Sequence, residues 1–287
     1  MTISRCEEDM TLPEPIGQAA LAFFQKLLGP VGEAGEFLTD KIRFYRWQSS
    51  LKTLQKAREI AAEYKLEVNE VPLKFLIPFM EKSSLEDDDS EMTVRWANLL
   101  ASAMESPTEA KVPFIDILAK IGPSEVIILE DLISKEYSTE YLESSHPTIK
   151  FASHNFASRF ATSSSMASFF SLLTSDSTDE TAKIVCQKFM EMEENEGFLI
   201  EAVEYSIEKD GDHRLTGIEP NMKVFSRMMS FELLQSLSLV TRSIYVHRSA
   251  AVYVSITMIT PTPLAFSFVT ECRGDRIMAK ASAVAKE

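Results

Sequence analysis

The 287 residues are 45% apolar and 25% charged, which is ordinary for a globular protein and excludes a wholly disordered chain. A formal net charge of −14 at pH 7 argues against a protein that coats nucleic acid, because phosphate binding relies on Lys and Arg. The N-terminal residues are acidic and lack an apolar run, so we expect no signal peptide. The three widely spaced cysteines indicate a reducing cytoplasm.

The first segment, residues 1–30, contains one helical pattern. Apolar residues recur at helical spacing from Ile16 to Leu28, and a glycine–proline pair then ends the pattern. We predict a short amphipathic helix. A membrane-binding helix is the alternative, but such helices usually carry several Lys and Arg residues, and Lys26 is the one basic residue in this stretch.

A long helix is predicted from Val31 to about Tyr64, because this stretch has no proline and no glycine after Gly35. Its apolar residues recur every three to four positions, a spacing close to the heptad that packs one helix against another. The helix therefore needs a neighbour, which is supplied either by this chain or by a second copy in a homo-oligomer.

The other side of this helix is basic. We interpret it as a solvated face, and the alternative is a surface that binds an anionic partner. In that alternative Arg43, Arg46 and Trp47 are the candidate partner-binding residues, and Arg95 from a later helix is a weaker member. The basic residues of the helix are Lys41, Arg43, Arg46, Lys52, Lys56 and Arg58.

Two helices are predicted between residues 71 and 103. The first opens with a Val–Pro pair, and Pro78 is expected to kink it or divide it into two. The second follows an acidic cluster, in which Asp88 is the expected N-cap and Glu91 completes a capping box. The cluster lacks the alternating oxygen ligands and central glycine of a calcium loop, so we predict a cap and no metal site. The expected buried face consists of Met92, Trp96, Leu99, Leu100 and Ala103, and another face carries Arg95, Asn98 and Ser102.

Two further helices, Val112–Gly122 and Pro123–Ile133, complete a helical domain over residues 31–135. Residues 136–215 begin with an insertion rich in Ser and Thr. Helical spacing then resumes and is expected to continue to a turn at Asp210–Asp212.

The C-terminal unit, residues 216–275, is predicted to contain a helix over Lys223–Val240 and then a β-hairpin, because apolar residues alternate from Ile244 to Met258. A last helix over Thr262–Cys272 follows, and this order of helix, hairpin and helix is winged-helix-like. Residues 276–287 form a tail. The expected fold class is mainly α, with a helical N-terminal domain that contains a long helix plus a small α+β winged-helix-like C-terminal unit.

The chain contains no motif for phosphate, dinucleotide, zinc-protease or serine-hydrolase chemistry. The four histidines are dispersed, and the cysteines show no metal-ligand spacing. We therefore predict no catalytic residue, no cofactor and no metal. The alternative is a hydrolase whose Ser, Cys or His residues meet only in the folded chain.

Several runs resemble the Abi-alpha family. They are "VPLKFLIPFMEKSSLED", "WANLLASA" and "PFIDILAKIGPSEVIILEDL", together with the long helix and its cluster of Arg43, Arg46 and Trp47. The run "TPLAFSFVTEC" resembles the end of that family more loosely, because Ala265 stands where the family has glycine. The resemblance implies a bacterial protein that takes part in abortive infection, a defence against phage, and it implies no catalytic residues.

We therefore expect a cytoplasmic, non-enzymatic defence protein that binds a protein partner. One alternative is a membrane-acting effector that uses the N-terminal amphipathic helix. Another is a DNA-binding regulator, although the net charge disfavours nucleic acid. Its phosphate contacts in the C-terminal unit would be Lys223, Arg227, Arg242 and Arg248.

Overall fold

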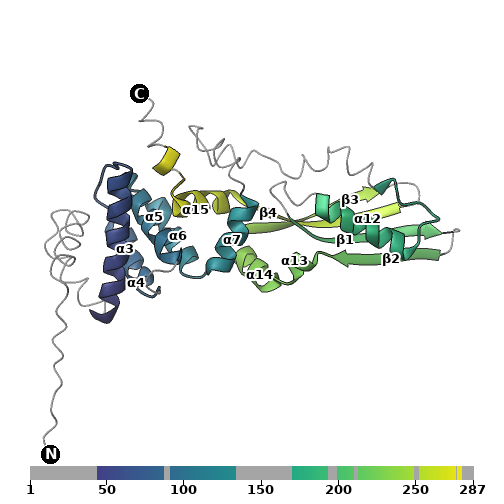
Figure 1. The fold of residues 1–287 in the computed structure, drawn as a ribbon, viewed down its shortest axis with the longest axis horizontal. Coiled ribbons are helices and arrows are strands. Elements are labelled where there is room, and N and C mark those ends of the chain that lie inside the picture. The colour runs from purple at the N-terminus through teal and green to yellow at the C-terminus, as the bar shows by residue number, and fades with distance from the viewer. Residues whose placement is uncertain are drawn as a thin grey trace, which may run out of the picture. The chain divides into compact units, whose positions relative to one another are not determined.

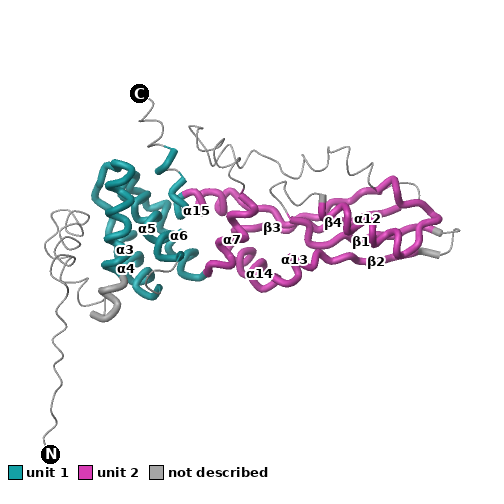
Figure 2. Tube along the Cα trace, in the orientation of Figure 1, with its two compact units in different colours: residues 1–120, 271–287 teal, residues 121–270 magenta. Residues whose placement is uncertain are grey.

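The computed structural model describes residues 44–86, 91–133, 170–192, 199–209, 213–248, 252–275 and 277–279. The described elements are drawn in Figure 1. The chain divides into two compact units, residues 1–120 with 271–287 and residues 121–270, which are coloured separately in Figure 2. The described part of the first unit is helical, and the second unit combines helices with a β-sheet.

The first unit is built around α3 (Phe44–Glu63), which packs against α4 (Leu73–Ser83) and α5 (Glu91–Glu105). The apolar seam that predicted this helix is buried at Leu51 and Leu54, and the basic residues Lys52, Lys56 and Arg58 are exposed as expected. The described half of the apolar seam therefore packs against other helices of the same chain. The predicted start of the helix, before Phe44, lies outside the described residues.

Helix α4 begins directly after Pro72 and runs without interruption through Pro78. A kink or a division into two helices was predicted at Pro78, and the division is therefore wrong. A proline inside a helix removes one backbone hydrogen bond. Here the packing outweighs that loss, because Phe75, Leu76, Phe79 and Met80 of the same helix are completely buried.

Helix α5 buries the predicted apolar face and also residues outside it. Trp96 is completely buried with its ring edge-on to Phe79 at a centroid distance of 5.5 Å, and its Nε1 donates to Oε1 of Glu86 at 3.1 Å. Glu86, from the acidic cluster before α5, thus accepts the hydrogen bond of the Trp96 indole N–H. The predicted N-cap Asp88 lies outside the described residues. Asn98 and Ser102 were expected on another face, but they are buried too, so α5 is enclosed on nearly all sides. A 3₁₀ turn (Glu109–Lys111) and α6 (Val112–Leu118) complete this unit.

The second unit begins with α7 (Pro123–Leu132) and contains a four-stranded antiparallel sheet in the order β2-β1-β4-β3. The strands are β1 (Leu199–Lys209), β2 (His213–Pro220), β3 (Val240–Arg248) and β4 (Val252–Pro261). The predicted hairpin over 244–258 is confirmed as β3 and β4. The hairpin pairs through β4 with β1 and supplies two of the four strands of the sheet.

The prediction of a helix that continues to the turn at Asp210 is wrong, because residues 199–209 form β1. Val203, Tyr205 and Ile207 alternate with polar residues and face the core, which is the period of a strand. A register shift between Ile200 and Ala202 breaks this alternation at the start of the strand, and so hides it in the sequence.

The stretch predicted as one helix over Lys223–Val240 forms two short helices, α13 (Met222–Phe225) and α14 (Met228–Ser236). Asn221 caps α13 by accepting a hydrogen bond from the N–H of Lys223 at 3.0 Å. Asn221 also fixes α13 to the start of β1, because its Nδ2 donates to the carbonyl oxygen of Ile200 at 2.9 Å. The last predicted helix is confirmed as α15 (Pro263–Arg273).

Helix α12 (Asp179–Met192) covers one face of the sheet (Figure 1). Tyr205 of β1 joins the two: its Oη donates to Oδ1 of Asp179 at 2.7 Å, and Asp179 also pairs with Lys183 at 2.9 Å. Burial raises the pKa of Tyr205, and the hydrogen bond to Asp179 raises it further, so the hydroxyl stays a donor at neutral pH. The ring of Tyr205 lies over Gly217, its register partner on β2.

We predict that Gly217→Ala destabilises the second unit by about 1–3 kcal/mol, as overpacking usually does. A Cβ at Gly217 would overlap the Tyr205 hydroxyl oxygen, and the buried ring cannot move aside without losing its bond to Asp179. Urea denaturation followed by circular dichroism measures the change. Thr216→Ala on the same strand, where the side chain is exposed, is the control. Equal stability of the two variants would contradict the packing argument.

Candidate partner-binding site

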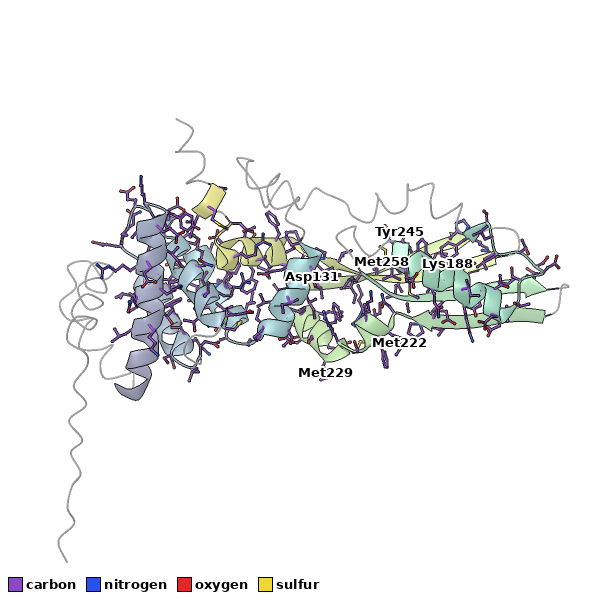
Figure 3. The ribbon with its side chains drawn as sticks, viewed as in Figure 1. Asp131, Lys188, Met222, Met229, Tyr245 and Met258 are labelled. Atoms are coloured by element: carbon purple, nitrogen blue, oxygen red, sulfur yellow. The ribbon has the colours of Figure 1, made fainter. Side chains whose placement is uncertain are left out.

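Large apolar side chains are exposed on α13 and α14. Met222 is 65% exposed, Phe225 58% and Met229 82%, and together we call these three residues the apolar cluster. Figure 3 shows Met222 and Met229 projecting from the same edge of the second unit. Large exposed apolar patches on soluble proteins mark interaction sites.

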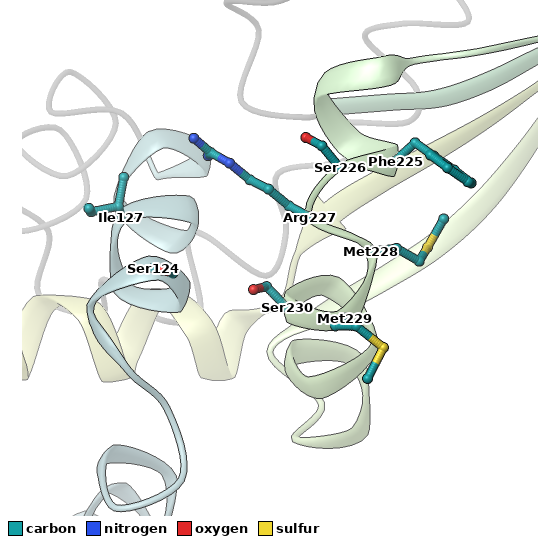
Figure 4. A pocket seen from close by; sticks show the side chains of 8 residues that line it. All are labelled: Ser124, Ile127, Phe225, Ser226, Arg227, Met228, Met229 and Ser230. Atoms are coloured by element: carbon teal, nitrogen blue, oxygen red, sulfur yellow. The ribbon is translucent and has the colours of Figure 1, made fainter.

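A pocket of about 380 Å³ lies beside this cluster, between α7 and the segment formed by α13 and α14. In Figure 4, Arg227 extends toward α7, whereas Phe225, Met228 and Met229 point to the other side. The pocket therefore has a polar part near α7 and an apolar part away from it. The lining residues are Ser124, Ile127, Phe225, Ser226, Arg227, Met228, Met229 and Ser230.

Glu125 of α7 fixes the spacing across the pocket. Its Oε1 accepts from Oγ of Ser230 on α14 at 2.6 Å, and its Oε2 accepts from the N–H of Gly122 at 2.8 Å. Burial opposes ionisation of this carboxyl, but the hydrogen bonds from Ser230 and Gly122 outweigh it and lower the pKa of Glu125. The carboxylate is therefore ionised at neutral pH, and the hydroxyl of Ser230 must be the donor.

Arg242 of β3 fixes α14 to the sheet. Its Nε lies 2.8 Å from Oε2 of Glu201 on β1, and its Nη2 lies 3.0 Å from Oε1 of Glu232 on α14. The guanidinium also bonds Gln235 of the same helix. Arg242 was a predicted phosphate contact in the DNA-binding alternative, and the structure gives it two carboxylate partners within the chain.

Arg227 is the charged side chain of the pocket lining, which contains no carboxylate within the described ranges. Arg227 is exposed, and it forms no ion pair with any acid of those ranges. A guanidinium in this state offers a planar set of N–H donors to an incoming carboxylate. The pocket therefore presents one cation, three hydroxyls and an apolar rim.

A buried group of Ser102, Lys111 and Glu271 in the first unit resembles a serine–lysine dyad at first sight. Nζ of Lys111 lies 2.6 Å from Oγ of Ser102 and 3.2 Å from Oε2 of Glu271, and the Ser102 hydroxyl donates to that same carboxylate. Lys111 is thus a donor to Oγ and cannot accept its proton. The side chains of Lys111 and Glu271 are 4% and 6% exposed, so this arrangement is structural.

The described cysteines also lack the properties of a nucleophile. Cys186 and Cys272 are buried and form no disulfide within the described residues, and burial raises the pKa of the Cys186 thiol to about 12. The reactive form of cysteine is the thiolate, which is negligible at neutral pH for such a thiol. The described residues also contain no group of three or more His, Cys, Asp or Glu side chains that could hold a metal ion. None of the helices in these ranges combines the length and hydrophobicity needed to cross a bilayer.

The family model for abortive infection alpha matches residues 46–195, which is just over half of the chain. The chain belongs to the abortive infection alpha family. Comparison with curated proteins and with solved structures gives no significant match. The match contains the run from Val71 to Leu132 on which the resemblance rested, and the looser resemblance at Thr262–Cys272 lies outside it.

The pocket of this abortive infection alpha protein combines matched and unmatched parts of the chain. Ser124 and Ile127 of α7 lie within the family match, whereas α13 and α14 lie beyond residue 195. Sequence reasoning missed this site because it treated α13 and α14 as one helix. The available signal was the run "NMKVFSRMMSFELL", whose apolar residues are too many for one buried face.

None of the four partner-binding residues predicted from sequence lines this pocket. Arg43 lies outside the described residues, and Arg46 and Trp47 belong to the first turn of α3, where side chains are not described. Arg95 is partly exposed on α5 and already interacts with another group. The surface formed by these four residues therefore stays a prediction.

We expect Glu271→Gln to lower the free energy of unfolding by roughly 3–5 kcal/mol, because it leaves the buried charge of Lys111 without its partner. The double variant Lys111→Met/Glu271→Leu should lose less stability than the single variant, since apolar side chains often replace a buried ion pair well. Urea denaturation measures both changes.

The control for this test is Lys74→Met, which breaks an ion pair with Glu109 in the same unit. That pair has an N–O distance of 2.6 Å, but its side chains are 66% and 62% exposed, so little stability should be lost. A Glu271→Gln variant as stable as Lys74→Met would show that the buried pair with Lys111 does not stabilise the first unit, to which Glu271 belongs.

Proposed function

We propose that this abortive infection alpha protein defends cells against phage by binding a protein partner through the apolar cluster of α13 and α14. The observation that carries the proposal is the exposure of Met222, Phe225 and Met229 beside a pocket that contains an unpaired arginine in the described ranges. Aromatic residues, methionine and arginine are the side chains enriched in the buried centres of protein interfaces.

The physical argument concerns the free energy of exposed apolar surface. Each of these side chains loses favourable transfer free energy by facing water, about 25 cal/mol for each Å² left uncovered. A protein partner would cover this surface and recover that free energy. Methionine is well suited to the role because its flexible, polarisable side chain adapts to partners of different shape.

The surface predicted from sequence around Arg43, Arg46 and Trp47, with Arg95, is proposed as a second contact for an anionic face of the partner. The charge-reversal variant Arg43→Glu/Arg46→Glu tests it in a phage plating assay. Full protection by a folded variant would rule this second surface out, without affecting the proposal for the apolar cluster.

Two alternatives remain distinct from this proposal. The membrane-acting effector would use Ile16–Leu28, which lies outside the described residues. The DNA-binding regulator would lack Arg242 as a phosphate contact, because Glu201 and Glu232 occupy its guanidinium. Protein binding is favoured because α13 and α14 expose three large apolar side chains and one cation, Lys223.

We predict that Phe225→Ser/Met229→Ser abolishes protection against phage while leaving the fold intact. Both side chains are exposed, so their truncation removes no core packing. Affinity for the partner should fall by on the order of 30-fold, because truncation of a central interface residue costs about 2 kcal/mol or more. Efficiency of phage plating on cells that express each variant is the measurement, with circular dichroism as the check on folding.

The matched control is Ile244→Ser/Val246→Ser on β3, which removes two exposed apolar side chains from another part of the same unit. We expect this variant to keep protection. The proposed surface is wrong if the α13–α14 variant is folded and protects as well as the wild type, or if the β3 control loses protection to the same degree.

A further inference from the structure

We propose that the pocket between α7 and the α13–α14 segment binds a short peptide segment in which an acidic residue stands beside an apolar one. This inference rests on the proposed function, because it names the chemistry of the partner at the same surface. Its volume of about 380 Å³ lies at the lower end of the roughly 300–1,000 Å³ usual for ligand pockets. It therefore accommodates a few side chains of a partner.

The charge of the lining selects a carboxylate. Arg227 is its cation, the lining contains no acid within the described part of the chain, and the ionised Glu125 nearby is already satisfied by Ser230 and Gly122. The chain as a whole is acidic, but charges further than about 8 Å are screened at physiological ionic strength. The local cation therefore decides which ligand charge is accepted.

The hydroxyls of the lining select a peptide over a phosphate. Ser230 must donate its proton to the Glu125 carboxylate, and Ser226 must donate its proton to the carbonyl oxygen of Lys223 at 3.0 Å. Each hydroxyl oxygen can then act toward a ligand only as an acceptor. A peptide supplies N–H donors for these oxygens as well as a carboxylate for Arg227, whereas an ionised phosphate offers mainly acceptors and leaves the hydroxyl oxygens without donors.

The rim of the pocket selects an apolar neighbour for the acidic residue. Phe225, Met228 and Met229 form one side of the lining, and Ile127 contributes a further exposed apolar side chain from α7. A ligand whose carboxylate pairs with Arg227 would thus reach the apolar part of the same pocket, formed by Phe225, Met228 and Met229, with another of its side chains. The peptide segment binds through one charge, its N–H groups and one apolar side chain.

The test uses a library of random twelve-residue peptides displayed on yeast and selected on the full-length protein. We expect the selected peptides to be enriched several-fold in Asp or Glu next to an apolar residue. Binding of the most enriched peptide, labelled with fluorescein and measured by anisotropy, should weaken by about 10- to 100-fold in Arg227→Gln, the range for a hydrogen bond to a charged group.

Three further measurements sharpen this result. Arg227→Lys should bind with intermediate affinity because lysine lacks the planar fork of donors. Arg248→Gln on β3 makes the same change of charge outside the pocket and should bind as the wild type does. Millimolar inorganic phosphate should not displace the peptide, and displacement by phosphate at Arg227 would overturn the choice of a peptide ligand.

The inference is wrong if the selected peptides show no acidic enrichment, or if they bind Arg227→Gln as tightly as the wild type. Phage plating separates this failure from that of the proposed function. Acidic peptides that depend on Arg227, together with full protection by Phe225→Ser/Met229→Ser, would support the ligand chemistry and refute the defence role of the surface. Loss of protection in Phe225→Ser/Met229→Ser, with no acidic enrichment among the selected peptides, would support the defence role of the surface and refute the ligand chemistry.

Discussion

The candidate site exists because Arg242 attaches α14 to the sheet. Helix α14 has nine residues, and isolated helices of fewer than about 12–15 residues are marginal in water, so its position depends on tertiary contacts. Those contacts are the ion pairs of Arg242 with Glu201 and Glu232, the bond from Ser230 to Glu125, and the buried side chains of Phe231 and Leu234. With α14 held in these ways, the outer face of the helix is free to carry residues that contribute nothing to folding.

The segment from Met222 to Arg242 departs from the usual distribution of polar and apolar side chains at a few positions. The side chain of Arg242 on β3 is 23% exposed and paired with acids, whereas Met229 on α14 is 82% exposed. Sequences that fold well place apolar groups inside, and departures from that rule concentrate at functional sites. The departure here lies next to the pocket, which is why the binding surface is assigned to this segment and not to the regular helices of the first unit.

The sequence predicted the elements whose pattern is regular over several turns. The amphipathic spacing of α3 and α5, the proline starts of α4 and α7, and the alternation in β3 and β4 each follow from local preferences. It did not predict β1, where a register shift between Ile200 and Ala202 interrupts the alternation, or the break between α13 and α14. The contact of Ser102 with Glu271 joins residues 169 positions apart, and no periodicity reports such a pairing. The site was missed for the same reason, because Arg227 meets Ser124 only in the folded chain.

The polar groups of the described chain fall into two classes, and the difference separates folding from binding. Lys111, Glu271 and Ser102 bond one another inside the first unit, where they are buried. Arg227 forms no ion pair in the described ranges and faces a pocket, while two hydroxyls beside it are committed as donors and open as acceptors. An unsaturated cation beside fixed hydrogen-bond acceptors is the arrangement on which the proposed binding of a ligand rests.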